Sequence, residues 1–149
     1  AQFVHLIRDG HDVVASHRDR WGYRSALRVA RTEWVRFVNA GRKFGAALPV
    51  GRYHELRYEE LVEAPEEAMR SLLAFLEEPW DEKVLRFDEA DHDATERYMR
   101  FTAERRRAAG ETSAIYRSRI GAGRGTLDPV LRGLLRASAR PLLRELGYA

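Results

Sequence analysis

An arginine and a serine eight residues apart are the best candidates for chemistry in this sequence of 149 residues. Arg8 follows the short apolar run 3–7, and Ser16 lies in a segment with helical spacing. A short apolar run that ends in a polar, glycine-containing turn is typical of a buried strand that leads directly into a helix. In open α/β sheets, ligands bind beyond the carboxyl ends of the strands. A guanidinium and a hydroxyl placed there suit an oxyanion such as phosphate.

The elements that position these two residues are a pair of strands and a set of helices. We expect Asp9 to cap the first helix, with Asp12 completing an imperfect capping box. The order strand, long helix, strand favours a parallel sheet with a right-handed crossover. The expected strands are 3–7 and 52–58, and the expected helices are 10–18, 23–48, 65–76, 82–87, 94–109 and 129–146, with a turn or short helix at 59–62.

Three details of these helices bear on the site. Trp34 lies on the apolar stripe of the long helix, and we interpret it as a core residue. Thr126 or Asp128 is expected to cap the last helix, and Pro141 to kink or split it. Residues 110–125 contain several glycines and arginines, which fits a mobile basic loop that brings backbone amides near an anion. A plain flexible connector explains the same composition.

The charges are strongly patterned, although the net charge is only +3. Residues 1–53 carry 10 basic and 4 acidic residues, residues 54–96 carry 4 and 15, and residues 97–149 carry 12 and 4. If the two basic segments meet in the fold, they form one anion-attracting surface. The alternative is that each is an ordinary solvated helix face.

The composition excludes several classes of protein. The absence of cysteine rules out disulfides and thiolate metal sites. No apolar run approaches the ~20 residues that span a bilayer, and no signal peptide precedes the first strand, so we expect a cytoplasmic protein without membrane contact. The cluster Asp88, Asp91, His92 and Asp93 matches no loop of defined ligand geometry, so we expect no metal.

The length and the 44% hydrophobic content predict a single domain over residues 1–149. The first expected strand begins only two residues into the chain, which indicates a piece of a longer protein.

Four segments of the sequence, 3–16, 53–62, 64–80 and 118–124 with the helix end 146–148, follow one another as in a known family. In that order they resemble the C-terminal half of sulfotransferases that use 3'-phosphoadenosine 5'-phosphosulfate (PAPS). The resemblance implies an α/β fold: a partial P-loop-NTPase-like parallel sheet, with about two strands here and a predominantly helical C-terminal part.

The resemblance also implies a nucleotide site. Arg8 matches the arginine that contacts the 3'-phosphate, and Ser16 matches the serine that shares that contact. His11 stands where many members have Arg or Lys, which leaves less permanent charge. The remaining implied contacts are Tyr58 against the adenine, and Arg119, Gly121 and Arg124 in the C-terminal loop. The sequence of that loop departs from the family's commonest basic-glycine pattern.

No catalytic residue is assigned. The family's glycine-rich loop for the 5'-phosphosulfate has no counterpart in the sequence, and neither has its base. His5 lies inside a strand and is expected to be structural, while His17, His54 and His92 have no evident partner.

The resemblance implies an enzyme that transfers a sulfuryl group from PAPS to a hydroxyl or amine of a small-molecule or glycan acceptor, releasing 3'-phosphoadenosine 5'-phosphate (PAP). We expect this chain alone to be inactive. A non-catalytic nucleotide-binding or interaction module is the alternative. Nucleic-acid binding by the basic segments is disfavoured, because the aromatic residues fall on core stripes.

Overall fold

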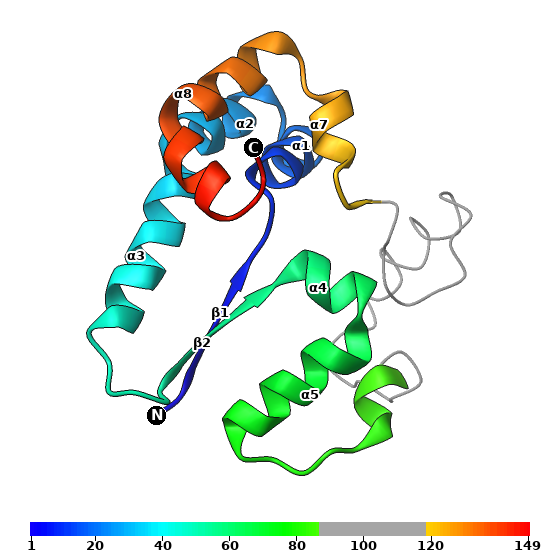
Figure 1. The fold of residues 1–149 in the computed structure, drawn as a ribbon. Helices are drawn as coiled ribbons and strands as arrows, with labels where there is room; N and C mark the ends of the chain where they lie inside the picture. Colours follow the sequence, from blue (N-terminus) through cyan, green and yellow to red (C-terminus); the bar gives the residue numbers. More distant parts are fainter. Residues whose placement is uncertain (87–118) are drawn as a thin grey trace. The chain divides into compact units, whose positions relative to one another are not determined.

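The computed structural model describes residues 1–86 and 119–149 (Figure 1). The chain divides into two compact units, Ala1–Glu59 with Ser118–Ala149, and Glu60–Arg117. Whether the chain behaves as a single domain stays a prediction, because compact units need not fold independently.

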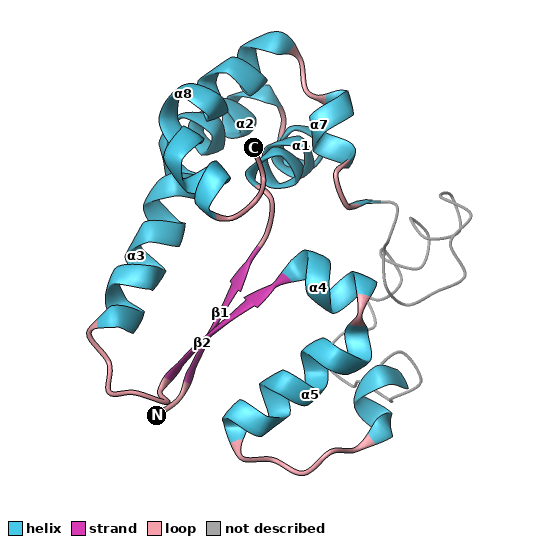
Figure 2. Ribbon diagram, in the orientation of Figure 1, coloured by secondary structure: helices cyan, strands magenta, loops and turns pink. Residues whose placement is uncertain are grey.

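A parallel pair of strands forms the sheet. Strand β1 (Phe3–Ile7) pairs with β2 (Tyr53–Arg57), from Phe3 opposite Tyr53 to Ile7 opposite Arg57. Figure 2 shows these strands as the only sheet among the described residues, which are otherwise mostly helical. The predicted fold class, α/β with two parallel strands and a mostly helical remainder, is confirmed.

Helix α1 (Gly10–Trp21) follows β1 after a two-residue turn. The helix was expected to end near Arg18, but it continues for three more residues. It ends at Gly22, whose φ of 81° lies in the left-handed region that favours glycine. The helix therefore stops where the backbone demands glycine, not where polar residues begin.

The long helix expected at 23–48 is present but contains an irregular turn. It consists of α2 (Tyr23–Arg28), the π-helical segment η1 (Val29–Glu33) and α3 (Trp34–Ala46). In η1 the backbone N–H of Trp34 donates to the carbonyl of Val29, five residues earlier. The Ser138 hydroxyl donates to the Ala30 carbonyl at 2.7 Å, which anchors this turn to the last helix.

The last helix, α8 (Pro129–Glu145), supplies much of the core. Asp128 is its N-cap and accepts from the amides of residues 130 and 131, so of the two predicted caps Asp128 is the correct one. Pro141 lies inside α8 without splitting it. The apolar side chains that form the core together include Ile7, Val14, Trp34, Val38, Leu131, Leu135, Leu142 and Leu143.

The short helix α7 (Ala122–Thr126) corrects one expectation. Residues 122–125 were expected to belong to an irregular basic loop, but they form a helical turn whose N-cap is Gly121 at φ 70°. The rest of that loop before residue 119 lies outside the described residues, as do the expected helix 94–109 and the cluster at 88–93.

The second unit contains α5 (Pro65–Leu76) and the 3-10 helix η2 (Glu82–Arg86), preceded by the short helix α4 (Tyr58–Glu63). All three follow the predicted positions. Within this unit the Arg70 guanidinium lies 3.9 Å from the ring centre of Trp80. Among the described residues, none of the helices is both long and apolar enough to cross a membrane.

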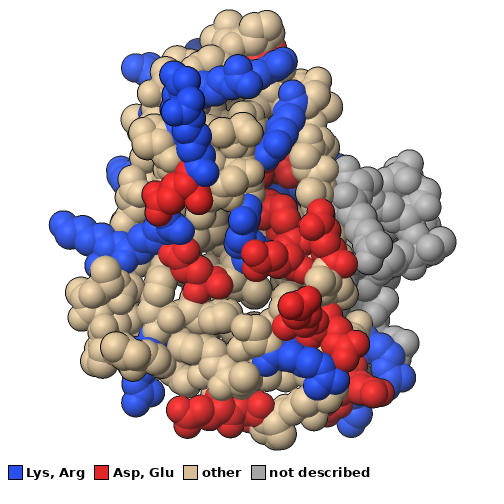
Figure 3. All heavy atoms as spheres, viewed as in Figure 1, with Lys and Arg blue, Asp and Glu red and all other residues tan. Residues whose placement is uncertain are grey.

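The two basic sequence segments, as far as they are described, belong to the same unit. Residues 1–59 and 119–149 carry 17 basic and 8 acidic side chains, whereas residues 60–86 carry 3 and 8. Figure 3 shows many of these basic side chains over α8, at the top of the view. The described parts of the two basic segments therefore lie in one positively charged unit, which is the condition for a shared anion-attracting surface.

Candidate functional site

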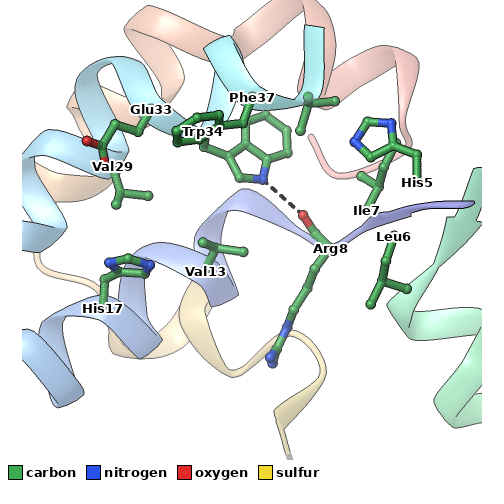
Figure 4. A pocket seen from close by; sticks show the side chains of 11 residues that line it. His5, Leu6, Ile7, Arg8, Val13, His17, Val29, Glu33, Trp34 and Phe37 are labelled. Atoms are coloured by element: carbon green, nitrogen blue, oxygen red, sulfur yellow. Dashed lines mark hydrogen bonds between the residues drawn. The ribbon is translucent and has the colours of Figure 1, made fainter. Parts of the chain in front are cut away.

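Trp34 holds the turn between β1 and α1 through a hydrogen bond and through packing of its ring. The indole N–H of Trp34 donates to the carbonyl oxygen of Arg8 at 3.0 Å (Figure 4). A Cβ on Gly10 would lie 3.0 Å from the Trp34 ring, so the indole packs directly on the helix start. Trp34 is 5% exposed, which confirms its interpretation as a core residue. Its position fixes where the Arg8 side chain begins.

The Arg8 side chain points away from Trp34 and towards α7 (Figure 4). Its Nη2 donates to the carbonyl oxygen of Arg119 at 3.0 Å and lies 3.7 Å from a carboxylate oxygen of Asp12. The guanidinium covers one face of the Tyr58 ring, with 4.3 Å between its carbon and the ring centre. Within the part of the chain that the structure describes, its buried Nε has no hydrogen-bond partner.

Asp12 joins α1 to the start of α7. Its side chain is 1% exposed, and its two oxygens accept from the backbone amides of Gly121 at 2.9 Å and Gly123 at 2.8 Å. The expected capping box is therefore wrong: the amide of Asp9 donates to Glu59 at 2.9 Å, not to Asp12. The Asp12 carboxylate instead pairs with residues more than a hundred positions away.

Asp9 forms a second link to the same segment. Its carboxylate caps α1 by accepting from the His11 amide, and also contacts the His11 ring at 2.9 Å and Arg124 Nε at 3.0 Å. Burial alone would raise the pKa of Asp9, but the hydrogen bonds from His11 and Arg124 outweigh it and hold the pKa below its ordinary value. Asp9 is thus an ionised, fully partnered carboxylate. His11 contacts this carboxylate through both its amide and its ring, and is itself buried.

Five of the six predicted contact residues come together here. Arg8 contacts both the Tyr58 ring and the Arg119 carbonyl directly. Gly121 is joined to the same turn through Asp12, and Arg124 through Asp9. Ser16 follows one helical turn after Asp12 on the same face of α1 and is half-buried.

Sequence reasoning missed the roles of three residues at this turn. Asp12 was assigned to a local cap, Gly123 was only part of a glycine-rich stretch, and Trp34 was only core. The sequence held no signal for these roles. The close approach of Gly123, where a Cβ would lie 2.2 Å from the backbone oxygen of His11, is visible only in the fold.

A separate polar network lies where α3 packs on the strands. The His5 ring and the Tyr53 hydroxyl are 2.6 Å apart, and that hydroxyl donates to Glu55 at 2.8 Å. Arg42 binds both oxygens of Glu55 at 2.8 Å and reaches Glu145 at 2.6 Å. His5 is therefore a structural residue, as expected.

A pocket of about 250 Å³ opens between β1, α1 and the helix that contains Trp34 (Figure 4). Its walls are mostly apolar, including Val13 and Phe37, and its polar members include His5, His17 and Glu33. His17 contacts Ser25 at 3.0 Å, so the expectation that it lacks a partner is wrong. Of the predicted contact residues, only Arg8 lines this pocket.

The family follows from comparison with known proteins. Residues 1–82, more than half of the chain, match the profile of the sulfotransferase family. The chain belongs to this family.

Individual relatives agree with this assignment. A protein-tyrosine sulfotransferase of Drosophila melanogaster is 30% identical over 94 residues, which are 60% of this chain and 19% of that protein. An uncharacterized protein of Aquifex aeolicus is 49% identical over 37 residues, 25% of this chain and 5% of that protein.

Two solved structures have the same fold. The sulfotransferase domain from the curacin biosynthetic pathway superimposes with a TM-score of 0.77 at 19% identity, over 99% of this chain and 54% of that one. The sulfotransferase domain from the Synechococcus PCC 7002 olefin synthase gives 0.78 at 18% identity, over 100% and 50%. The chain thus spans about half the length of these domains.

Proposed function

We propose that this chain is the part of a PAPS-dependent sulfotransferase that holds the 3'-phosphate of the nucleotide, with Arg8 and Ser16 as its principal contacts. The observation that carries the proposal is the Arg8 guanidinium at the carboxyl end of β1, with a buried Nε that has no partner among the described residues. Ligands of open α/β sheets bind at this end.

The electrostatics of the turn support an anion. Asp12 lies 3.7 Å from Arg8 and Asp9 follows Arg8 in the chain, and both already accept hydrogen bonds within the protein. Their charges are therefore balanced internally. Arg124 contacts Asp9 through its Nε, and Arg119, whose carbonyl oxygen accepts from Arg8, has its own guanidinium 3.9 Å from a carboxylate oxygen of Asp19. A phosphate near −2 is best held by such planar, bidentate donors together with a neutral hydroxyl.

The other predicted contacts take supporting roles in this proposal. Tyr58 has Arg8 over one face of its ring, and an adenine would lie near that residue. Gly121 contributes through its backbone conformation, since its amide already donates to Asp12.

PAPS supplies the activated sulfuryl group, and the proposed acceptor is a hydroxyl or amine. The Drosophila melanogaster relative is named for tyrosine, which supports a hydroxyl. Neither a glycine-rich phosphate loop nor an assignable base lies among residues 1–149. In this proposal the described residues contribute binding and orientation of the nucleotide.

Titration of PAP and of 5'-AMP against the intact protein tests the site. Arg8→Ala should weaken PAP binding about 10- to 150-fold, or roughly 1.5–3 kcal/mol, because a charged hydrogen bond to the phosphate is lost. It should leave the weaker binding of 5'-AMP nearly unchanged, since that nucleotide lacks the 3'-phosphate.

Arg136→Ala, which removes an exposed arginine from α8, is the matched control for loss of charge and should retain wild-type PAP affinity. Equal PAP affinity in wild type and Arg8→Ala would exclude Arg8 from the site.

A non-catalytic nucleotide-binding module is the second candidate, and the lack of an assignable base favours it. Incubating the intact protein with PAPS and with phenol, alcohol and amine acceptors separates the two. Release of PAP that depends on an acceptor indicates the enzyme, whereas tight PAP binding without any turnover indicates the module.

A further inference from the structure

Two buried carboxylates next to a proposed phosphate site need an explanation. Asp9 is 2% exposed and Asp12 is 3% exposed, and an uncompensated negative charge there would repel a phosphate. Asp9 has ordinary reasons to be present, because it caps α1 and contacts His11. Asp12 caps no backbone group of α1: besides its ion pair with Arg8, it binds the amides of Gly121, the N-cap of α7, and of Gly123 inside α7.

The contacts of Asp12 are well suited to holding a loop. One carboxylate oxygen accepts from each of the amides of Gly121 and Gly123, so both of its oxygens are used. The same carboxylate lies 3.7 Å from Arg8 Nη2, whose other contact is the carbonyl of Arg119. Three groups of the turn and the loop therefore meet at the Asp12 side chain, and the Arg119 carbonyl is joined to it through Arg8.

The segment 119–124 is packed closely against α1, in addition to its hydrogen bonds with Asp12. A Cβ on Gly123 would lie 2.2 Å from the backbone oxygen of His11 and 2.6 Å from the amide nitrogen of Asp12. Neither of these backbone atoms can move aside as a side chain could. Glycine at this position lets the two amides come within reach of the carboxylate.

We propose that Asp12 is a positioning residue: its carboxylate fixes the segment 119–124 against α1, and thereby holds the Arg119 carbonyl against Arg8 and Arg124 against Asp9, so that the Arg8 guanidinium is oriented for recognition of a 3'-phosphate. The charge of Asp12 is balanced by two amides and one guanidinium, so it organises the cationic groups without opposing the ligand. This inference rests on the proposed function and assigns a role to a residue outside the six predicted contacts.

Asp12→Asn in the intact protein tests the inference. An asparagine side chain has a single acceptor oxygen, so at least one of the two glycine amides loses its partner. Amide hydrogen exchange without nucleotide should accelerate about tenfold or more at residue 121 or 123. The ratio of PAP to 5'-AMP affinity should fall about tenfold or more, because the arginines are no longer held in place.

Asp128→Asn is the matched control. Asp128 also accepts from two backbone amides, but it does so at the start of α8, where asparagine is an equally good cap. It should change neither the exchange at residues 121 and 123 nor the nucleotide ratio.

Gly123→Ala provides an independent route if Asp12→Asn fails to fold. It leaves the carboxylate intact but pushes the loop off α1, and should lower the nucleotide ratio in the same way. Faster exchange in Asp12→Asn with an unchanged ratio would overturn the positioning role, as would unchanged exchange. A wild-type protein that does not prefer PAP to 5'-AMP would instead overturn the proposed function itself.

Discussion

Two glycines on α3, Gly41 and Gly45, stand where aromatic side chains of the strands need space. A Cβ on Gly41 would lie 2.4 Å from the His5 ring, and one on Gly45 would lie 2.5 Å from the ring of Tyr53. These rings cannot simply turn away, because the His5 Nδ1 and the Tyr53 hydroxyl are hydrogen-bonded to each other at 2.6 Å. The close packing of α3 on the sheet therefore depends on the absence of two side chains.

Gly41→Ala should lower the free energy of unfolding by about 1–3 kcal/mol, the usual cost of overpacking. Gly133→Ala on α8 is the matched control, because nothing lies within 4 Å of its added Cβ. That substitution should raise stability by about 0.5–1 kcal/mol through helix propensity alone. Chemical denaturation of both variants measures the difference, and a loss of stability in both would contradict the packing explanation.

Local contacts explain which residue roles the sequence could predict. Asp128 at a helix start and His5 inside a strand were assigned correctly, because capping and strand periodicity act within a few residues. The pairing of Asp12 with Gly121 spans 109 positions and carries no local signal. The capping-box interpretation of Asp12 was reasonable from spacing, but tertiary contacts decided otherwise.

At the scale of elements, the network of His5, Tyr53, Glu55 and Arg42 links α3 to both strands and makes their packing depend on pH. Burial is the main reason why the pKa of His5 lies below its ordinary 6.5; Arg42 adds to this effect and Glu55 opposes it. The folded chain thus binds fewer protons at His5 than the unfolded chain does. Its contribution to stability is complete above pH 6.5 and is lost as the pH falls below that value.

Burial lowers the pKa of His17 from 6.5 in the same way. We therefore expect the free energy of unfolding to decrease between about pH 7 and pH 5. His5→Gln should make that decrease smaller, and adding His17→Gln should make it smaller again. Urea denaturation at several pH values measures the slope, and an unchanged slope in the double variant would show that neither histidine is responsible.

The strand and helix boundaries were largely predictable, since glycine and proline mark many of them. The π-helical turn could not be predicted. One extra residue in a turn leaves the spacing of the apolar residues in 23–48 consistent with a single stripe, so the pattern fits a regular helix equally well. The helical turn at 122–126 was missed for the opposite reason. Its composition, rich in glycine, indicates a loop, and only contacts with α1 hold it in helical form.

At the scale of the whole molecule, β1 presents an apolar surface to solvent. Val4 is 44% exposed and Leu6 is 53% exposed, and Phe37 on α3 is 60% exposed. Exposed strands with apolar side chains favour pairing with another chain. The described sheet has only two strands, so β1 has an edge without a partner among the described residues.

The 149-residue chain purified alone should therefore self-associate, and Leu6→Lys should reduce this association. Val50→Lys is the control, because Val50 is fully exposed in the turn before β2 and does not belong to the strand surface. Sedimentation velocity over a range of concentrations measures the effect. Equal association of both variants would indicate that contacts elsewhere are responsible.

The π-helical turn has a consequence for comparing this chain with its relatives. A π turn holds one residue more than an α turn, so a relative with a regular helix here must be aligned with a one-residue gap inside 29–33. Copying coordinates across without that gap would rotate the preceding residues by about 100° relative to Trp34. Ala26, which is fully buried here, would then be placed outside the core.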